Sequence, residues 1–280
     1  MSAKAIVGGV EALPITLCVS TRNAASVLAG CVESVRDWVS EIVVVDMESS
    51  DTTLELARSY GATIVQVPAA GWAEPGRQAG IDAATQPWIL VLDADERAAG
   101  GLRALAAEYI AREDLCGVHL PRQNFQFGWW VPGSGIWPDW QLRLFRGDRT
   151  RWPGLRTHEG PTVAGRVEHA PARAENAIVH HSFVSIADWM ASANRYTDLE
   201  AARLAGSGRK PSLPRLMAIP IARFVEVYIV KRGYRGRRYG LTIALMAMCY
   251  WLIAELKVWE RRLATEQPTP DALAETRIKA

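Results

Sequence analysis

Apolar runs alternate with helical patterns along the first part of the chain. Each run is followed by a turn and then by apolar positions at helical spacing, before the next run begins. This alternation is typical of a parallel sheet covered by helices on both faces. The runs that predict strands are 15–20, 41–46, 62–68 and 88–95, and the segments that predict helices are 27–38, 54–60 and 78–85.

Polar residues gather where each predicted strand ends. TRN occupies 21–23, DMESSDTT 46–53, GWAEPGR 71–77 and DADE 93–96. In an open α/β sheet, ligands bind outside the carboxyl ends of the strands, where the connecting loops meet. The sequence therefore predicts that these loops converge on one crevice. The region 116–185, with its short alternating segments and many Trp, Gly and Pro, is typical of an irregular substrate-facing part.

Composition excludes several classes of protein. At 280 residues, 49% of them hydrophobic, the chain is long enough to bury a full core. A net charge of +2 argues against wholesale nucleic-acid binding. The four cysteines lack CxxC spacing, which favours reduced thiols over disulfides or structural zinc. The N-terminus lacks the apolar core of a secretory signal, so we expect a cytoplasmic protein.

The stretch DADE sets two aspartates, Asp93 and Asp95, at the end of a buried run. Because side chains alternate along a strand, an Asp-x-Asp pair is expected to point to one side of it. Carboxylates in that arrangement suit Mg²⁺ or Mn²⁺ and, through the metal, diphosphate oxygens. The other interpretation is a strand-to-helix corner with an N-cap aspartate.

Several motifs follow one another in an order more specific than any one of them: VSTRN, VVVDMESSDTT, GWAEPGRQAGIDAA, WILVLDADE, PDWQLRLFR, THEG, and VHHSF with NRYTDLEA. In this order they resemble glycosyltransferase family 2, the inverting GT-A-type nucleotide-sugar transferases, and its lipopolysaccharide-core β-glucosyltransferase branch. The resemblance covers about 15–200. It implies an α/β fold of GT-A type, with a Rossmann-like, mostly parallel sheet and a C-terminal helical appendage.

The resemblance also implies a division of the chain into domains. We expect a GT-A catalytic domain at 1–205, a helical and membrane-associating segment at 206–265, and a flexible tail at 266–280. Within the catalytic domain, 14–100 would be the nucleotide-binding half and 101–187 the acceptor half. A helical pattern at 188–205 closes the catalytic domain in this scheme.

The donor site is implied residue by residue. Asp46 looks like the aspartate that reads the base of a uridine-type nucleotide, in a pocket lined by the first loop. The residues that the resemblance implies are Thr21, Arg22 and Asn23 for that loop, Asp46 for the base, Arg77 for the diphosphate, Asp93 for the ribose and Asp95 for the metal.

Two departures from the family pattern stand in the first loops. Ala24 occupies the place where the family usually has an acid after the Asn. The second loop, DMESSDTT, lacks the glycines of the family's DxGSxDGT-like loop, which makes it conformationally less permissive. These departures bear on the geometry of the loop and the identity of the nucleotide.

Inversion by direct displacement requires a carboxylate to take the proton of the acceptor hydroxyl. Asp139, in WPDWQLRLFR, stands where many family members carry the aspartate of a Glu-Asp pair, although Pro138 precedes it here. We expect its tryptophan neighbours to desolvate it and raise its pKa. Glu159, in THEG, is the alternative base.

A histidine is implied as a further ligand of the Mg²⁺ or Mn²⁺ ion. His158 looks like the late histidine that completes the metal shell in some relatives, and His180 and His181 compete for that role. Around these residues, aromatic and basic side chains either bind sugar and diphosphate or serve the core and an exposed strand face. They are Trp129, Trp130, Trp137 and Trp140, and Arg143, Arg146, Arg149, Arg151 and Arg156.

The C-terminal region combines apolar helices with a basic turn. The turn, KRGYRGRR at 231–238, joins the apolar segment 216–230 to the uncharged segment 239–254. The latter is shorter than the roughly 20 residues that a spanning helix needs. The pattern therefore predicts a hairpin lying on an anionic cytoplasmic leaflet. The alternative is a helix pair packed on the catalytic domain or on a second subunit.

The sequence thus predicts a metal-dependent inverting glycosyltransferase at the cytoplasmic face of the plasma membrane. It would move a hexose from a nucleotide diphosphate donor, UDP-linked, to a saccharide or lipid-linked acceptor in cell-envelope glycan synthesis. The alternatives are a polyprenyl-phosphate sugar synthase, whose acceptor needs little deprotonation, and a nucleotide-sugar or glycan binding module without catalysis. No nucleic-acid partner is expected, and a homo-oligomer is left open.

Overall fold

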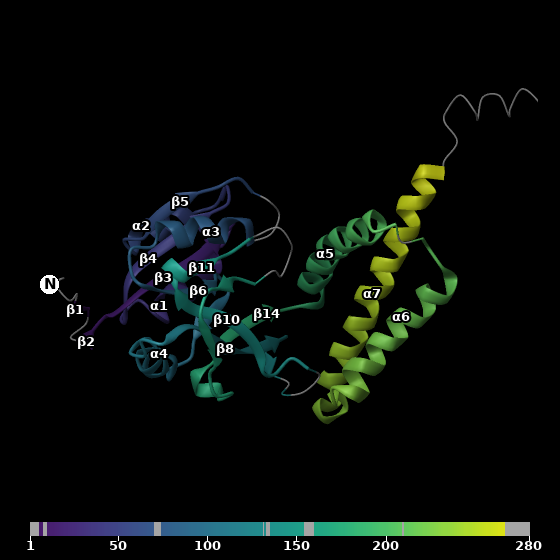
Figure 1. Ribbon diagram of the computed structural model, residues 1–280. Coiled ribbons are helices and arrows are strands. Elements are labelled where there is room, and N and C mark those ends of the chain that lie inside the picture. The colour runs from purple at the N-terminus through teal and green to yellow at the C-terminus, as the bar shows by residue number, and fades with distance from the viewer. Residues whose placement is uncertain are drawn as a thin grey trace, which may run out of the picture. The chain divides into compact units, whose positions relative to one another are not determined.

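The computed structural model describes residues 6–7, 10–69, 74–130, 132, 135–153, 160–208 and 210–266. The chain forms two compact units (Figure 1). The first, here called the sheet unit, contains residues 1–130 and 137–182. The second, the helical unit, contains residues 131–136 and 183–280.

A mixed and mostly parallel sheet organises the sheet unit. In spatial order its strands are β5 (Thr63–Gln66), β4 (Val39–Asp46), β3 (Leu13–Thr21), β6 (Trp88–Asp93), β10 (Asp139–Arg146), β8 (Leu115–Gln126), β14 (Ile178–Phe183) and β7 (Glu96–Ala98). The first four are parallel to one another, whereas β10 runs antiparallel to both β6 and β8.

Short strands complete the sheet unit. β9 (Trp129–Trp130) and β13 (Arg166–His169) pair with β8, β11 (Thr150–Arg151) with β12 (Thr162–Val163), and β1 (Ile6–Val7) with β2 (Val10–Glu11). The helices of this unit are α1 (Ala25–Glu33), α2 (Thr53–Ser59), α3 (Glu74–Ala83) and α4 (Leu102–Ile110), with 3₁₀ turns at Gly147–Arg149 and Ala174–Asn176.

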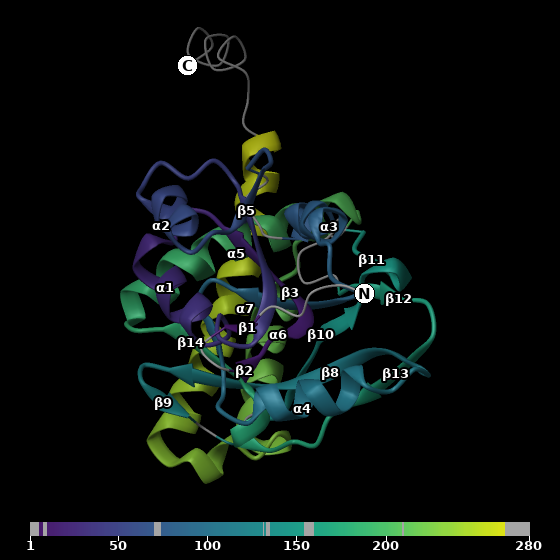
Figure 2. The ribbon, with the colours of Figure 1, turned by 90° about the vertical axis from the view of Figure 1, so that its left-hand side faces the viewer.

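Helices cover both faces of the sheet (Figure 2). Alternation along β3 sends Leu17 and Val19 into one core, where they meet Leu28 of α1, and Cys18 into the other, which contains Ile81 of α3. A strand with apolar side chains on both faces needs a helical layer on each. The predicted α/β fold with a mostly parallel sheet is thereby confirmed.

The predicted strands correspond to β3, β4, β5 and β6, and the predicted helices between them to α1, α2 and α3. One detail of DADE was wrong. β6 ends at Asp93, Ala94 and Asp95 form a turn, and β7 begins at Glu96. The alternation of side chains along a strand therefore does not position Asp95, because the strand has already ended.

Three long helices form the helical unit: α5 (Ile186–Gly206), α6 (Leu213–Val225) and α7 (Arg237–Glu266). A π-helical turn, η3 (Glu226–Val230), continues α6, and a 3₁₀ turn, η4 (Gly233–Gly236), precedes α7. α7 packs against both α5 and α6. Leu204 of α5 contacts Val258 of α7 in a small buried cluster, and Lys257 forms an ion pair with Asp198 at 2.8 Å.

This packing gives a division of the chain that differs from the expected boundary at residue 205. Because α5 packs against α7, the helix expected to close the catalytic domain belongs to the helical unit. The observed units separate after Ser182. Of the expected tail, 267–280 lies outside the described residues.

The segment Gly233–Leu263 is the one helix, within the described part of the chain, that is long and apolar enough to cross a membrane. Only 33% of its most apolar window is buried inside the protein. The uncharged stretch 239–254 forms the middle of this helix.

Candidate active site

Polar side chains meet at the carboxyl ends of the parallel strands. Thr21 ends β3, Asp46 ends β4 and Asp93 ends β6. Thr21 is the register partner of Asp46, and Asp93 is the partner of the neighbouring Ser20. The side chains predicted to face one crevice therefore lie side by side at this edge of the sheet, as the topology requires.

Asp46 ties the first two loops together. Its fully buried carboxylate accepts a hydrogen bond from Thr21 Oγ1 at 3.3 Å and another from the backbone N–H of Ser49 at 3.1 Å. Asn23 acts in the same way, because its Oδ1 accepts from the N–H of Ser50 at 2.8 Å. Asp46 thus shapes the loop, and its role in reading a base stays a prediction. Arg22 is exposed.

The second loop contains a backbone conformation that favours glycine. Glu48 has a φ of 58°, in the left-handed region where the Cβ of an L-residue crowds a carbonyl oxygen. This is the place of the first glycine in the family's DxGSxDGT-like loop. Glu48 therefore adopts a conformation that a glycine would adopt freely, and this backbone strain costs about 1 kcal/mol.

Asp93 lies between two arginines. Arg77 Nη2 donates to its Oδ1 at 2.5 Å, and Arg143 Nη2 donates to its Oδ2 at 2.8 Å. Burial acts to raise the pKa of Asp93, but the charges and hydrogen bonds of Arg143 and Arg77 hold that pKa well below its usual range. The guanidinium of Arg77 also stacks over the ring of Trp152, 4.7 Å from its centroid.

Buried N–H groups of these arginines are left over. Nε and Nη1 of Arg77, and Nη1 of Arg143, find no hydrogen-bond partner within the described part of the chain. Buried donors are normally satisfied, so such atoms point to a ligand that accepts from them. An anion with several oxygens, such as a diphosphate, has the matching chemistry.

The acids Asp93, Glu96 and Asp139 and the arginines Arg77, Arg122 and Arg143 form one cluster, and Glu96 is its buried centre. Its carboxylate is fully inaccessible, and Oε1 accepts from Arg122 Nη1 at 2.9 Å and from Arg143 Nη2 at 3.4 Å. Oε2 accepts from the backbone N–H of Asp93 at 2.9 Å. A buried carboxylate persists only when charges and hydrogen bonds compensate it. The third acid of DADE therefore anchors the turn that carries Asp95.

Asp139 also has a guanidinium partner. Arg122 Nη2 lies 2.7 Å from its Oδ2, and the amides of Asn124 and Gln141 donate to it at 3.0 and 2.7 Å. Burial acts to raise the pKa of Asp139, yet Arg122 and the two amides outweigh it, and the pKa lies below its usual value. The predicted rise was wrong because Arg122 stands opposite Asp139 on β8.

A histidine faces the second aspartate of DADE. His180 Nε2 lies 3.4 Å from Asp95 Oδ2, and His180 Nδ1 lies 2.7 Å from Asn124 Oδ1. Because the Asn124 amide nitrogen donates to Asp139, its oxygen is the atom facing His180. Nδ1 of His180 therefore carries a proton, and Nε2 is the nitrogen that gains or loses a proton when the ring titrates.

The carboxylate of Asp95 shifts His180 towards its protonated form. Burial acts to lower the pKa of His180, but the hydrogen bond and charge of Asp95, together with Glu96, raise it above its usual value. Asp95 is also the more open partner, at 42% exposure of its side chain. Among the described residues, no group of three or more His, Cys, Asp or Glu could hold a metal ion.

Two predicted site residues, His158 and Glu159, lie outside the described residues, and so does Arg156. His181 stacks on Phe125, with ring centroids 5.2 Å apart, whereas His180 is the histidine that lies beside Asp95.

The predicted aromatic and basic side chains are divided between ring contacts, the cluster and the surface. The Trp137 ring contacts the Trp130 ring edge to face, with centroids 5.5 Å apart, and the Trp140 ring contacts the His169 ring in the same way at 4.8 Å. Trp129 is exposed. Of the arginine series, Arg143 lies in the cluster; Arg146 is over the Trp88 ring, and Arg149 and Arg151 are exposed.

Sequence reasoning missed three members of the cluster, Glu96, Arg122 and Asn124, and left Arg143 without a defined partner. A signal existed for β8, where Arg122 and Asn124 are separated by two and so share a face. Arg143 carried no such signal, because the register between β10 and β8 shifts between Leu142 and Leu144. A bulge of this kind re-aims a side chain in a way that alternation does not predict.

Comparison with known proteins gives consistent matches. The family model described as glycosyl transferase family 2 matches residues 16–169. The lipopolysaccharide core biosynthesis glycosyltransferase LpsC of Rhizobium meliloti is 26% identical over 266 residues, covering 92% of this chain and 97% of the relative. An uncharacterized glycosyltransferase of Rickettsia bellii is 27% identical over 235 residues, covering 79% and 77%. The S. aureus TarS 1-349 structure in complex with UDP-GlcNAc has a TM-score of 0.50 at 13% identity, covering 92% and 93%.

Proposed function

The chain belongs to glycosyl transferase family 2, and we propose from this that it moves a hexose from a UDP-linked donor to a saccharide or lipid-linked acceptor. The relative LpsC, similar over nearly its whole length, carries a name from lipopolysaccharide core biosynthesis, which supports a place in cell-envelope glycan synthesis. The observation that carries the proposal is the cluster of acids and arginines at the carboxyl edge of the sheet.

The donor binds over the ends of β3, β4 and β6. The loop of Thr21, Arg22 and Asn23 and the buried Asp46 form the nucleotide side, and Asp93 lies on the ribose side. The leftover N–H groups of Arg77 and Arg143 bind the diphosphate, because guanidinium groups match phosphate oxygens in charge and geometry.

Mg²⁺ or Mn²⁺ fits the open side of the cluster. Asp95 offers a carboxylate oxygen, the ligand type that both ions prefer, and His180 adds an imidazole nitrogen beside the diphosphate and water oxygens. When bound, the ion stabilises the negative charge on the departing diphosphate. His158 remains the alternative to His180 as the histidine ligand.

Asp139 is the proposed base that takes the proton of the acceptor hydroxyl. A pKa below the usual value keeps its carboxylate ionised at neutral pH, and Arg122, Asn124 and Gln141 fix its orientation. The same contacts weaken it as a proton acceptor. Glu159 remains the alternative base.

The decisive experiment measures Mn²⁺-dependent release of UDP from a panel of UDP- and GDP-sugars, with detergent-solubilised membrane lipid as the acceptor source. We expect one UDP-sugar to turn over and Asp95→Ala to lower turnover by about a hundredfold or more. Asp37→Ala is the matched control, since Asp37 is exposed in the turn before β4, at the opposite end of the strands. Full activity of Asp95→Ala would refute the metal assignment.

A second candidate is a polyprenyl-phosphate sugar synthase, favoured by the pairing of Asp139 with Arg122. A phosphate acceptor is already ionised and needs little help from a base. The variant Asp139→Asn separates the two functions. If the acceptor is a hydroxyl group, we expect Asp139→Asn to lose nearly all turnover. If the acceptor is a phosphate, we expect the variant to keep a substantial part of its turnover. Donor binding by the wild type without transfer or hydrolysis would instead support a binding module.

A further inference from the structure

Helix α6 and the π-helical turn η3 carry an exposed row of apolar side chains. Leu213, Met217, Ile221 and Val225 follow one another at intervals of four residues, so they share one face of α6. Their exposed fractions are 63%, 58%, 53% and 43%. Ile229 and Val230, exposed to 53% and 70%, extend the row into η3. These six residues are called the apolar stripe below.

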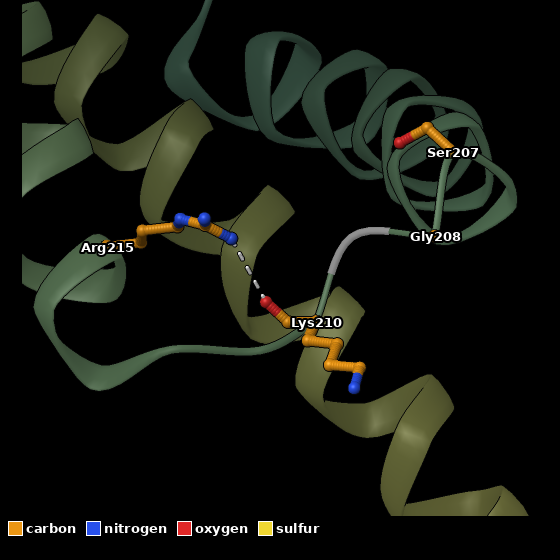
Figure 3. A pocket seen from close by; sticks show the side chains of 4 residues that line it. All are labelled: Ser207, Gly208, Lys210 and Arg215. Atoms are coloured by element: carbon orange, nitrogen blue, oxygen red, sulfur yellow. Dashed lines mark hydrogen bonds between the residues drawn. The ribbon is translucent and has the colours of Figure 1, made fainter.

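Cations flank the apolar stripe at both ends. Lys210 and Arg215 stand at its start, where they line a cavity of about 570 Å³ together with Ser207 and Gly208 (Figure 3). Lys231 and Arg232 stand at its end, and further arginines follow in the turn to α7. From 210 to 238 the chain has eight Lys or Arg residues and one Glu.

That single acid is already neutralised. Glu226 forms ion pairs with Arg223 at 2.6 Å and with Lys231 at 2.9 Å. The hydrogen bonds of Lys231 and Arg223 keep the pKa of Glu226 below its usual value, so it stays ionised beside them. The segment is therefore apolar along the stripe and carries its excess positive charge towards the two ends.

We propose that the apolar stripe is a docking surface for an anionic lipid bilayer, with α6 and η3 lying in the plane of the membrane. The row lies on one face only, and the ion pair of Arg223 and Glu226 interrupts the same segment, so it matches a helix that lies along the interface, because a spanning helix would bury that pair in the hydrocarbon layer. The cavity of Lys210 and Arg215 receives a lipid phosphate, while the stripe enters the acyl boundary.

Helix α7, although long enough to cross a membrane, acts as the support for this surface. Ala244, Ala254 and Val258 of α7 are buried, and Lys257 donates to the backbone oxygen of Asn194 in α5 at 2.6 Å. Arg261 donates to the backbone oxygen of Asp198 at 3.3 Å. These contacts hold α7 against its neighbours within the helical unit.

Charge also argues for a lipid partner over a second copy of this chain. In a two-fold dimer the same patch lies on both sides of the interface. Pairing this face with itself would bring two strongly positive surfaces together, whereas an anionic bilayer complements them.

The test is sedimentation of the full-length chain with vesicles, without donor or metal. We expect binding to phosphatidylcholine vesicles that contain 30% phosphatidylglycerol, and little binding to phosphatidylcholine alone. Ile221→Glu should weaken binding at least tenfold, and Arg232→Gln about fivefold. Leu256→Glu is the matched control: Leu256 lies on α7, is 47% exposed and is outside the stripe.

Three outcomes would overturn the proposal. One is equal binding to both kinds of vesicle, and another is an equal effect of Ile221→Glu and Leu256→Glu. The third is a wild-type dimer that Ile221→Glu converts to a monomer while vesicle binding stays unchanged, which would make the stripe a self-association surface. Because no donor is present, failure of the proposed transfer reaction would leave this test unaffected.

Discussion

At the scale of single residues, Asn124 connects the two chemical ends of the site. Its amide nitrogen donates to Asp139, and its oxygen faces Nδ1 of His180. Residues that orient a metal ligand from behind typically affect affinity or activity by 10- to 100-fold. Asn124 is therefore a positioning residue for both the proposed base and the proposed histidine ligand.

We expect Asn124→Leu to lower kcat by about 10- to 100-fold and to raise the Mn²⁺ concentration needed for half-maximal activity. Gln123→Leu is the control, since Gln123 is the preceding residue of β8 and, by alternation along the strand, lies on the opposite face. Steady-state kinetics at varied Mn²⁺ measures both quantities. An unchanged Mn²⁺ dependence in Asn124→Leu would show that His180 is not positioned through this amide.

Glu48 offers a second prediction at this scale. Replacing it with glycine removes the left-handed strain at φ 58°, so Glu48→Gly should raise the free energy of unfolding by about 0.5–1 kcal/mol. Urea denaturation measures the difference. Glu55→Gly, inside α2, should instead lower stability by a similar amount. If both variants lose stability, the loop conformation is not strained.

At the scale of elements, the sequence predicted the four parallel strands because their apolar runs need no information from elsewhere in the chain. The sequence also predicted that Thr21, Asp46 and Asp93 lie at one edge of the sheet, since parallel strands place their carboxyl ends together. The partners of Asp93 and Asp139 were not predictable in the same way. Arg122 and Arg143 reach them through pairings between β8, β10 and β6, and a one-residue shift in register decides where each side chain points.

An ion-pair cluster ties the end of α4 to β13. Arg112 donates with two nitrogens to Glu168, at 2.7 and 2.8 Å, and Arg166 pairs with the same carboxylate. The hydrogen bond to Arg112 is the main cause of the lowered pKa of Glu168, which is about 2 in place of 4.5.

Because the folded-state pKa is lower than the unfolded one, this pair contributes its full stability above about pH 4.5 and loses it as the pH falls towards 2. Glu168→Gln should therefore be less stable than the wild type at pH 7, and the two should converge in acid. Thermal melts between pH 7 and pH 3 measure this. A difference in melting temperature that is independent of pH would assign the effect to packing.

At the scale of the whole molecule, the chain is divided into a sheet unit that contains the proposed donor site and a helical unit that contains the apolar stripe. Composition and motif order predicted both parts. The division itself was not predictable, because the pattern of α5 alone does not tell whether its buried face meets the sheet or α7. Contacts such as Leu204 with Val258 decide that question, and they join residues distant in sequence.

This division predicts that damage to the helical unit spares donor binding. Leu204→Ala, at a side chain 4% exposed, should cost about 2–4 kcal/mol and reduce hydrogen-exchange protection in α5 and α7. The dissociation constant for UDP should stay unchanged by isothermal titration. Leu263→Ala, at 58% exposure, is the control and should change little. Weaker UDP binding in Leu204→Ala would show that the units are not independent.

The alternation of acids and arginines across the site has a consequence for how the donor enters. Asp93, Glu96 and Asp139 are matched by Arg77, Arg122 and Arg143, so this group of side chains is electrically neutral before any ligand arrives. A sugar-linked nucleotide diphosphate brings about two negative charges, and a divalent cation brings as many positive ones. If donor and cation enter as one neutral complex, the site stays electrically neutral. Removing the cation with a chelator should therefore release the nucleotide as well.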